Sequence, residues 1–332
     1  MAALRAHRLA FARGAHTAAM SAVARIALLS GVALACLVAC VRAPAATPPQ
    51  IRIATWNLEW LISPDDALAL RQRCRRGEKR LPCDVVQDRA RSAADFDALA
   101  RYAAGLRADV VAVQEVDGPA AARRVFPDAR FCFTQRRDLQ NVGFAIRAHV
   151  PFRCEPDVQS ISLDDRVRRG AAVTLYPGDA REIRLLAVHL KSGCSREPLD
   201  SRARNCRQLA GQAPGVASWI AEQAAAGRAF AVLGDFNRDL RAESEAGTGL
   251  WAQLVAGTPA GAPLVDAGAG TAFRACHSGQ PFTRYIDYIL VGGGLAARLR
   301  PDSFTRHVYD DRDAHHFRLS DHCPLSVALR LR

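Results

Sequence analysis

Lysine is almost absent from this sequence. Among 332 residues it occurs only at Lys79 and Lys191, and arginine supplies nearly all of the basic charge. The formal net charge is +12 and the isoelectric point is about 9.7. A preference this strong for one basic residue partly reflects coding bias, so the charge by itself is weak evidence for a polyanionic partner. The hydrophobic content of 49% is that of an ordinary globular protein.

Acidic residues are missing from the first fifty positions, and long apolar runs are missing throughout. The longest run, residues 26–40, is too short for a confident membrane-spanning helix. A basic start, a short apolar stretch and small residues are typical of an export signal. The tetrapeptide LVAC at 37–40 resembles a bacterial lipobox, in which the cysteine becomes the lipidated first residue. We therefore expect a lipoprotein signal peptide at 1–40, with plain cleavage near residues 43–45 as the alternative.

A single large domain is expected beyond this signal. Residues 41–50 are rich in Pro and Ala and are predicted to be a linker. Neither an internal repeat nor a second linker follows, so residues 51–332 are predicted to form one domain. Export would place this domain in the periplasm, on the outer membrane through a lipid anchor at Cys40, or outside the cell.

Cys-x-x-Cys pairs are absent, which argues against a zinc site. Of the ten cysteines, the eight beyond Cys36 and Cys40 are an even number, and an exported protein meets oxidising conditions in which disulfides form. Eight cysteines allow about 105 connectivities, so the sequence alone leaves the pairing open. Closeness in sequence favours Cys74–Cys83 and Cys194–Cys206, and the remaining pairs would then be Cys132–Cys154 and Cys276–Cys323.

Hydrophobic patterning predicts alternating helices and strands. Residues 95–106 carry apolar side chains at helical spacing, and residues 203–226 are predicted to form a helix that is kinked at Pro214. Short apolar runs predict buried strands. These runs are 51–58, 108–116, 141–147, 170–176, 183–193, 229–237, 284–291 and 322–331.

Polar side chains recur within or at the ends of these strands. They are Asn57, Glu59, Glu115, His189, Asp235, Asn237, Asp287, Asp321 and His322. Each residue alone has an ordinary explanation as a turn residue or a satisfied core residue. Asp287 is the hardest to explain in this way, because a buried acid is costly unless it is paired or hydrogen-bonded. The repetition at strand ends indicates one shared site.

The segment LGDFNRDL, residues 233–240, follows an apolar run that is typical of a buried strand. Alternation along an extended chain predicts that Asp235 and Asn237 lie on one face, with Phe236 on the other. A carboxylate and a carboxamide would then project together from the end of the strand. Gly, Asp and Asn are also common turn residues, so the octet by itself leaves a turn open.

The order of these motifs resembles the endonuclease/exonuclease/phosphatase superfamily, which includes exonuclease III-like nucleases, DNase I and neutral sphingomyelinases. The resemblance spans nearly all of residues 51–332 and implies an α/β fold: a four-layer α/β sandwich of two packed mixed sheets flanked by helices. The motifs are TWNLEW (55–60), VQEV (113–116), VHLKSGC (188–194), GDFN (234–237), IDYILV (286–291) and SDHCP (320–324).

The resemblance also implies a role for each residue. Asp235 would orient or deprotonate the attacking water, Asn237 would hold water and phosphate, and His322 would contact a phosphate oxygen with Asp287 orienting it. His189 would lie near the leaving group. The implied cofactor is Mg²⁺, for which Mn²⁺ can substitute, because hard oxygen ligands neutralise a phosphodiester through such an ion. The implied metal ligands are Asn57, Glu59, Glu115 and Asp321, of which Glu59 lies where family members differ.

We therefore expect a monomeric, metal-dependent phosphodiester hydrolase, and nucleic acid is the substrate that we favour. Basic segments at 71–80, 136–137 and 166–169 suit a polyanion, with solvated arginine-rich loops as the less favoured alternative. The alternative is a sphingomyelinase-like phospholipid or small phosphoester hydrolase. An aromatic content of only 7% and the lack of an apolar hairpin argue against the lipid enzyme. Filled catalytic positions argue against a non-catalytic binding protein.

Overall fold

The computed structural model describes residues 49–77, 82–88, 90–136, 138–280 and 282–331. The predicted signal peptide with Cys40 lies outside this part, as do most of the linker and residues 78–80 and 137 of the basic segments. The described residues belong to one compact unit. Within them, no helix combines the length and the apolar character that crossing a membrane requires.

Six strands form the first sheet, in the order β11-β12-β1-β2-β4-β3. Strands β1 and β2 are parallel, whereas the other neighbours are antiparallel, so the sheet is mixed. The bounds are β1 (Gln50–Leu61), β2 (Val110–Val116), β3 (Ala129–Phe133), β4 (Asn141–Arg147), β11 (Thr305–Arg306) and β12 (Leu325–Arg330).

The second sheet also has six strands, in the order β5-β6-β7-β8-β10-β9. It is mixed in the same way, because β7 and β8 are parallel and the other neighbours antiparallel. The bounds are β5 (Phe152–Cys154), β6 (Ala171–Leu175), β7 (Ile183–His189), β8 (Phe230–Asp235), β9 (Val265–Asp266) and β10 (Asp287–Gly292).

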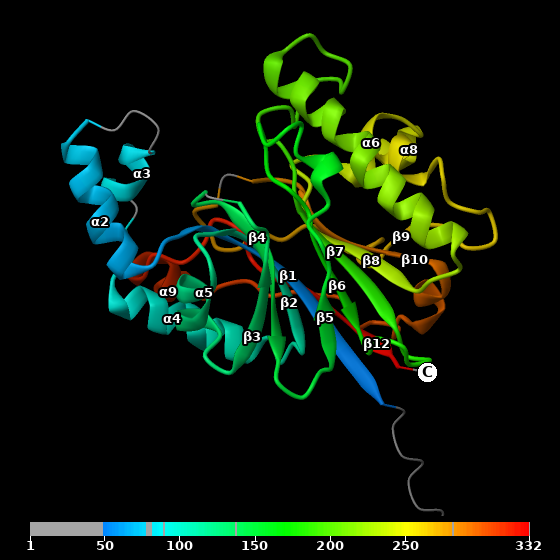
Figure 1. Ribbon diagram of the computed structural model, residues 1–332, viewed down its shortest axis with the longest axis horizontal. Helices are drawn as coiled ribbons and strands as arrows, with labels where there is room; N and C mark the ends of the chain where they lie inside the picture. Colours follow the sequence, from blue (N-terminus) through cyan, green and yellow to red (C-terminus); the bar gives the residue numbers. More distant parts are fainter. Residues whose placement is uncertain (1–48, 78–81, 89, 137, 281, 332) are drawn as a thin grey trace, which may run out of the picture. The chain divides into compact units, whose positions relative to one another are not determined.

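Helices cover the outer faces of both sheets (Figure 1). Helices α4 and α5 pack on the first sheet, α6 packs on the second, and α2 and α3 form a separate small cluster that projects from the first sheet. The bounds are α2 (Pro64–Arg75), α3 (Cys83–Asp88), α4 (Ala93–Gly105), α5 (Pro119–Val125), α6 (Arg204–Ala225), α7 (Leu240–Ala246), α8 (Gly249–Val255) and α9 (Asp311–His316).

Strand β1 shows how the sequence builds these layers. Ile51 and Ile53 belong to the core that lies between the sheets, whereas Trp56 and Leu58 belong to the core between the first sheet and its helices. Successive side chains of a strand point to opposite faces, so one strand serves both cores. The structure is thus helix, sheet, sheet and helix, which confirms the predicted four-layer sandwich.

Several element boundaries differ from the prediction. Strand β4 has the predicted bounds, but β8 ends at Asp235 rather than at Asn237. Helix α6 continues through Pro214 as one helix, as predicted, and the kink there remains a prediction. The basic segment that begins at Arg71 was expected to be a loop, yet helix α2 continues to Arg75. Its N-terminus has strong helix signals, with a Ser63 side-chain cap and a proline at the first position.

The structure pairs the cysteines as closeness in sequence suggested. Two of the disulfides close short loops, one joins β3 to β5 at the edges of the two sheets, and one joins the loop around residue 276 to the segment just before β12. The pairs are Cys74–Cys83, Cys194–Cys206, Cys132–Cys154 and Cys276–Cys323.

Candidate active site

Three polar side chains come from neighbouring strands of the second sheet. The pairing aligns His189 of β7 with Asp235 of β8, and Asp235 with Asp287 of β10. Residues that are paired in register lie on the same face of a sheet. The three side chains therefore form a row across the sheet, and all three are buried.

A tight approach between strands β7 and β8 explains the glycine of GDFN. Gly234 has φ +144°, and a Cβ atom on it would lie 1.9 Å from the carbonyl oxygen of Val188. Only glycine fits this position without moving β7. Because Asp235 follows directly, the close approach also sets where its carboxylate stands.

Asn237 reaches Asp235 by a turn and not by strand alternation. Its φ of +53° is left-handed, a conformation that asparagine tolerates better than most residues. The backbone N–H of Asn237 donates to Asp235 Oδ1 at 2.8 Å, and its side-chain amide donates to Asp235 Oδ2 at 3.0 Å and to the Leu190 carbonyl at 3.1 Å. The turn thus locks carboxamide and carboxylate together.

The first sheet contributes Asn57 and Glu115. Asn57 continues the inward face of Ile51 and Ile53, and its amide donates to Glu115 Oε1 at 3.3 Å and to Asp235 Oδ2 at 3.1 Å. It therefore connects the carboxylates of both sheets. Its own Oδ1 accepts from the backbone N–H of Glu59 at 3.0 Å.

Left-handed backbone concentrates at this site. Glu59, Trp60, Glu115 and Asn237 have φ values of 45°, 52°, 59° and 53°. Register shifts interrupt the pairing of β1 with β2 and of β2 with β4 at the same places. Simple alternation would send Glu115 to the outer face, because Val111 and Val113 belong to the outer core. Its left-handed conformation turns the carboxylate inward instead, and such strain is common at functional sites.

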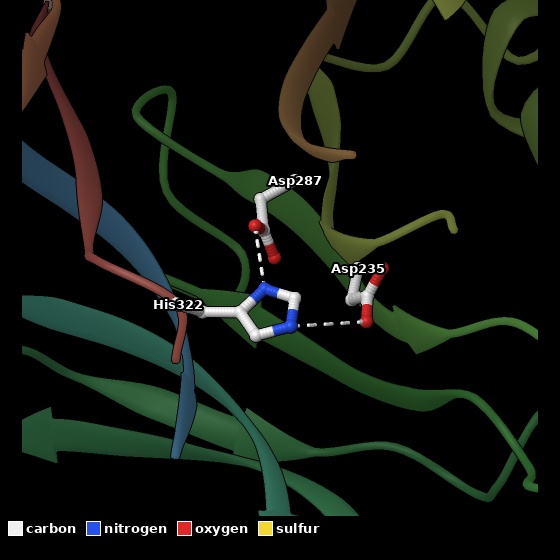
Figure 2. Close-up of side chains that lie close together, drawn as sticks. All are labelled: Asp235, Asp287 and His322. Carbon is white, nitrogen blue, oxygen red and sulfur yellow. Dashed lines mark hydrogen bonds and ion pairs between the residues drawn. The ribbon is translucent and has the colours of Figure 1, made fainter. Parts of the chain in front are cut away.

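His322 is held by its backbone as well as by its ring. The indole N–H of Trp56 donates to the His322 carbonyl at 3.2 Å, the hydroxyl of Tyr309 donates to the same oxygen, and the His322 N–H donates to Ser320 Oγ at 3.1 Å. On the ring, Nδ1 lies 2.7 Å from Asp287 Oδ2, and Nε2 lies 3.9 Å from Asp235 Oδ2 (Figure 2). The imidazole consequently has one orientation.

The two histidines are in opposite charge states. Burial opposes a charge on His322, but the negative charges of Asp287 and Asp235 outweigh it and raise its pKa well above the ordinary value. Burial, together with the positive charges of Arg168 and His322, lowers the pKa of His189 well below the ordinary value. At neutral pH the site therefore contains one imidazolium and one neutral imidazole.

Asp235 is an unusually basic carboxylate. Burial raises its pKa to about 7, with the charges of Asp287 and Glu115 adding to the effect and His322 opposing it. A carboxylate with a pKa near neutrality can accept a proton far more readily than an exposed one. Its surroundings thus suit Asp235 to the activation of water.

A pocket of about 630 Å³ opens over these side chains. Among the predicted residues, Glu115, His189, Asp235, Asn237, Asp321 and His322 line it. Asn57 lies behind Glu115 and Asp235, and Asp287 lies behind His322. The structure therefore gathers these residues in one place, as their positions at strand ends suggested.

Glu59 is directed differently. Its Oε2 accepts from the backbone N–H of Asp321 at 3.1 Å and lies 4.0 Å from the guanidinium of Arg91. Arg91 in turn donates to the carbonyls of Glu59 and Leu319 at 2.8 and 2.9 Å. These contacts tie the end of β1 to the loop that carries His322, and the role of Glu59 as a metal ligand remains a prediction.

Four cationic side chains that line the pocket were not predicted as site residues, namely Arg168, Lys191, Arg196 and Arg284. Arg168 was expected to be part of a basic surface segment, but it is directed inward and donates to the carbonyls of His189 and Leu190 at 2.9 and 2.8 Å. Its neighbour Arg169 is bound to Asp157 and Asp165 at 3.1 and 2.7 Å. This segment is thus not a free basic patch. Lys191 also lines the pocket, and the sequence signals for it were its place in the motif at 188–194 and the rarity of lysine.

Two sets of side chains have the chemistry to hold a cation. Within the described residues, one group of three has ligand atoms within 4.8 Å of one another, namely Asp235, Asp287 and His322. Nδ1 of His322 is already engaged there by Asp287, and imidazole suits zinc or copper better than magnesium. The other set, Glu115 and Asp321, offers hard oxygen atoms at the pocket wall with side-chain exposures of 14% and 44%. The carboxylate oxygens of this second set are ligands of the kind that a hard divalent cation prefers.

Comparison with known proteins agrees with this architecture. The model of the endonuclease/exonuclease/phosphatase family matches residues 54–322. Truncated TDP2 of Caenorhabditis elegans shares 14% identity and a TM-score of 0.56, over 85% of this chain and 98% of that chain. The D. rerio TDP2 complexed with single strand DNA product shares 18% identity and a TM-score of 0.54, over 84% and 98%.

A further solved structure is similar to the same extent. A protein of this family from Bacteroides thetaiotaomicron shares 15% identity and a TM-score of 0.51, over 85% of this chain and 98% of its own. None of the curated protein sequences compared with the chain matches it. At these identities the solved structures establish the fold and leave the substrate open.

Proposed function

Because this chain belongs to the endonuclease/exonuclease/phosphatase family, we propose that it hydrolyses phosphodiesters with the help of a divalent cation and that its substrate is nucleic acid. The observation that carries the proposal is the geometry around Asp235. A carboxylate whose pKa is about 7 lies 3.9 Å from the Nε2 of a charged histidine, inside a pocket with cationic walls. The proton-accepting carboxylate, the charged histidine and the cationic walls of the pocket are thus next to one another.

Asp235 is the group that we assign to the attacking water. Asn237 fixes its two oxygens through the backbone N–H and the side-chain amide. A water in the pocket can donate one proton to Asp235 while it approaches the phosphorus atom. Positioning the nucleophile and accepting its proton are separate contributions to rate, and one fixed carboxylate supplies both.

His322 is the group that we assign to the phosphate oxygens. Since Asp287 engages Nδ1, the N–H at Nε2 is the one that remains for the substrate. The high pKa keeps this imidazole charged at neutral pH. A charged donor that is already oriented stabilises the negative charge that builds up in the transition state.

Glu115 and Asp321 would hold Mg²⁺, with Asn57 holding Glu115 in place from behind. When bound, the cation would neutralise the phosphodiester and stabilise the developing charge. His189 remains neutral, with Nε2 3.6 Å from Glu115 Oε1 and 3.5 Å from Asp235 Oδ2. It can therefore exchange hydrogen bonds with a leaving oxygen without adding positive charge.

The walls of the pocket favour a polyanion over a lipid. Burial and the positive charges of Arg168 and Arg204 lower the pKa of Lys191, so cations are crowded here and a bound anion relieves their repulsion. Leu68 is the one large hydrophobic side chain that is strongly exposed in the described part of the chain. A single exposed leucine is no surface for entering a bilayer.

A substrate panel tests the proposal. The purified protein is incubated with plasmid, linear DNA, RNA and sphingomyelin vesicles in the presence of Mg²⁺, beside a His322→Ala variant of matched melting temperature. We expect cleavage of at least one nucleic acid by the wild type and a loss of about 10²–10³-fold in the variant. Hydrolysis of sphingomyelin alone, with every nucleic acid intact, would reject the nuclease and support the lipid enzyme.

A further inference from the structure

A second cavity, of about 360 Å³, adjoins the site pocket. The two share Ser195, Arg196 and Arg284 in their walls. Arg196 comes from the loop after β7, and Arg284 comes from the segment before β10. Two arginines from distant parts of the chain thus stand at the boundary between the cavities.

These two guanidinium groups are available to a ligand. Within the described residues, neither Arg196 nor Arg284 forms an ion pair or a side-chain hydrogen bond. Arg196 is exposed and Arg284 is half-buried. Other arginines of this protein are paired with carboxylates, as Arg169 is with Asp165 and Arg241 with Asp266. Two unpaired arginines therefore line one cavity.

The buried side chain of Arg238 holds the loop that carries Arg196 in place. Arg238 donates to Glu243 at 2.7 Å, to the Glu197 carbonyl at 2.6 Å and to the carbonyl of Cys194. The Cys194–Cys206 disulfide closes the same loop. The cation is thus mounted on a constrained segment, which lowers the entropic cost of binding an anion.

The charges that line the cavity leave it positive. Arg238 and Glu243 neutralise each other as an ion pair. Asp239 is the remaining acid, and its carboxylate accepts from the backbone N–H of Ala242 at 3.1 Å as the cap of α7. Arg196 and Arg284 contribute two positive charges against this one negative charge, and the hydroxyls of Ser195 and Thr248 are further hydrogen-bond donors. A compact anion such as a phosphate has both charge and hydrogen bonds to gain here.

We propose that this cavity binds a second phosphate of the substrate, the one next to the phosphodiester that is cleaved. The inference rests on the proposed function of the neighbouring pocket. Successive phosphates of a nucleic acid strand lie one nucleotide apart, so a strand with one phosphate beside His322 can place the next beside Arg196 and Arg284. The enzyme would then recognise two consecutive phosphates of one strand.

This subsite distinguishes substrate classes by charge. A choline phospholipid carries one phosphate followed by a quaternary ammonium group, which two guanidinium groups would repel. A polynucleotide, or a short oligonucleotide with a terminal phosphate, supplies a second anion instead. The cavity consequently selects against zwitterionic headgroups as well as for nucleic acid.

Three dinucleotides with the same bases provide the test. One has only its internal phosphodiester, one carries an added 5′-phosphate and one an added 3′-phosphate. The ratio of kcat/KM with and without the added phosphate is measured for the wild type and for the double variant Arg196→Gln, Arg284→Gln. We expect one of the two added phosphates, and not the other, to raise kcat/KM about tenfold in the wild type, on the scale of a charged hydrogen bond. The double variant should lose this gain.

The matched control is the double variant Arg107→Gln, Arg330→Gln, which removes one arginine in the turn before β2 and one at the end of β12, both away from the site. It should keep the full ratio. Three outcomes would overturn the subsite without contradicting the proposed nuclease activity. They are equal rates for all three dinucleotides in the wild type, an equal gain from either phosphate, and a gain that survives in the Arg196→Gln, Arg284→Gln variant. Failure of the proposed function would look different, because no dinucleotide would be cleaved at all.

Discussion

Asp287 Oδ2 lies 2.7 Å from Nδ1 of His322, and both side chains are at least nine-tenths buried, with exposures of 6% and 8%. Asp287 begins a strand of the second sheet, whereas His322 precedes the last strand of the first sheet. The bond therefore joins the two sheets at the site. It orients the imidazole and maintains its charge, and Asp235 lies on the far side of the ring.

This pair should act as one unit in catalysis. We expect Asp287→Asn to lower kcat by about 10²-fold or more, because an amide cannot stabilise the imidazolium as a carboxylate does. His322→Ala should lose at least as much, and the double variant should lose little more than His322→Ala alone. The control is His149→Ala, which removes an exposed histidine that contacts Asp109 at 3.1 Å far from the pocket. Fully additive losses would mean that the two residues act independently.

Activity should depend on a bound cation at the carboxylate set. EDTA should abolish turnover and Mg²⁺ or Mn²⁺ should restore it, and Glu115→Ala should raise the Mg²⁺ concentration needed for half-maximal rate at least about tenfold. Glu245→Ala, which removes an exposed acid elsewhere, is the matched control. Restoration by Zn²⁺ and not by Mg²⁺ would point to Asp235, Asp287 and His322 as the binding group. Full turnover in EDTA would contradict the mechanism.

The pKa of Asp235, about 7 without a cation, gives the pH profile a definite sign. The carboxylate must be deprotonated to accept a proton, so kcat/KM should rise with pH, reach half its maximum at or below about pH 7 and level off above that midpoint. A nearby cation favours the charged form, so the rising limb should move to lower pH as Mg²⁺ is increased. The raised pKa of His322 predicts that activity does not decline as the pH passes the ordinary histidine value of about 6.5. Kinetics from about pH 5 to 9 at two Mg²⁺ concentrations test both points. If the rising limb stays at the same pH at both Mg²⁺ concentrations, the assignment of Asp235 as the proton acceptor is wrong.

His307 should limit stability in acid. Burial, with the charge of Arg52 adding to it, lowers its pKa to about 4. The unfolded chain therefore takes up this proton near pH 6.5 while the folded protein does not, and the free energy of unfolding falls as pH drops from about 6.5 to 4. His307→Asn should remove about 1–2 kcal/mol of that fall, a value reduced from the full shift because the ring is partly exposed. Denaturation of both proteins at about pH 4.5 and 7.5 measures how far the free energy of unfolding falls between the two pH values. An equal fall in the wild type and in the variant would contradict the lowered pKa of His307.

Helix α2 should contribute binding rather than chemistry. Replacing Arg71, Arg73, Arg75 and Arg76 with Gln should weaken binding to long nucleic acid and flatten its log–log salt dependence by about one unit for each phosphate that is no longer bound. Hydrolysis of a small phosphodiester, which does not extend to this helix, should hardly change. Affinity across a salt series measures the effect. If the variant and the wild type have the same slope, α2 is not part of the surface that binds nucleic acid.

Much of the fold could be predicted because its signals are local. The apolar run at 141–147 became β4 with the same bounds, and the alternation in β1 divided Ile51 and Ile53 from Trp56 as the pleat requires. The cysteines that are neighbours in sequence did pair. The helix in the basic segment was missed, although Ser63 and Pro64 are a standard helix start.

The sequence by itself determined which chemical groups stand at the ends of strands, because strand periodicity and motif order are written in consecutive residues. Only the tertiary structure decided how those groups meet. The register across β7, β8 and β10 aligns His189, Asp235 and Asp287, and a left-handed φ turns Glu115 inward against its alternation. Burial keeps His189 neutral, whereas the negative charges of Asp287 and Asp235 outweigh burial and keep His322 charged. Arg168 is directed into the pocket, where it donates to the carbonyl of His189. These properties arise from contacts between residues far apart in the chain, and no local pattern encodes their distances or their electrostatic surroundings.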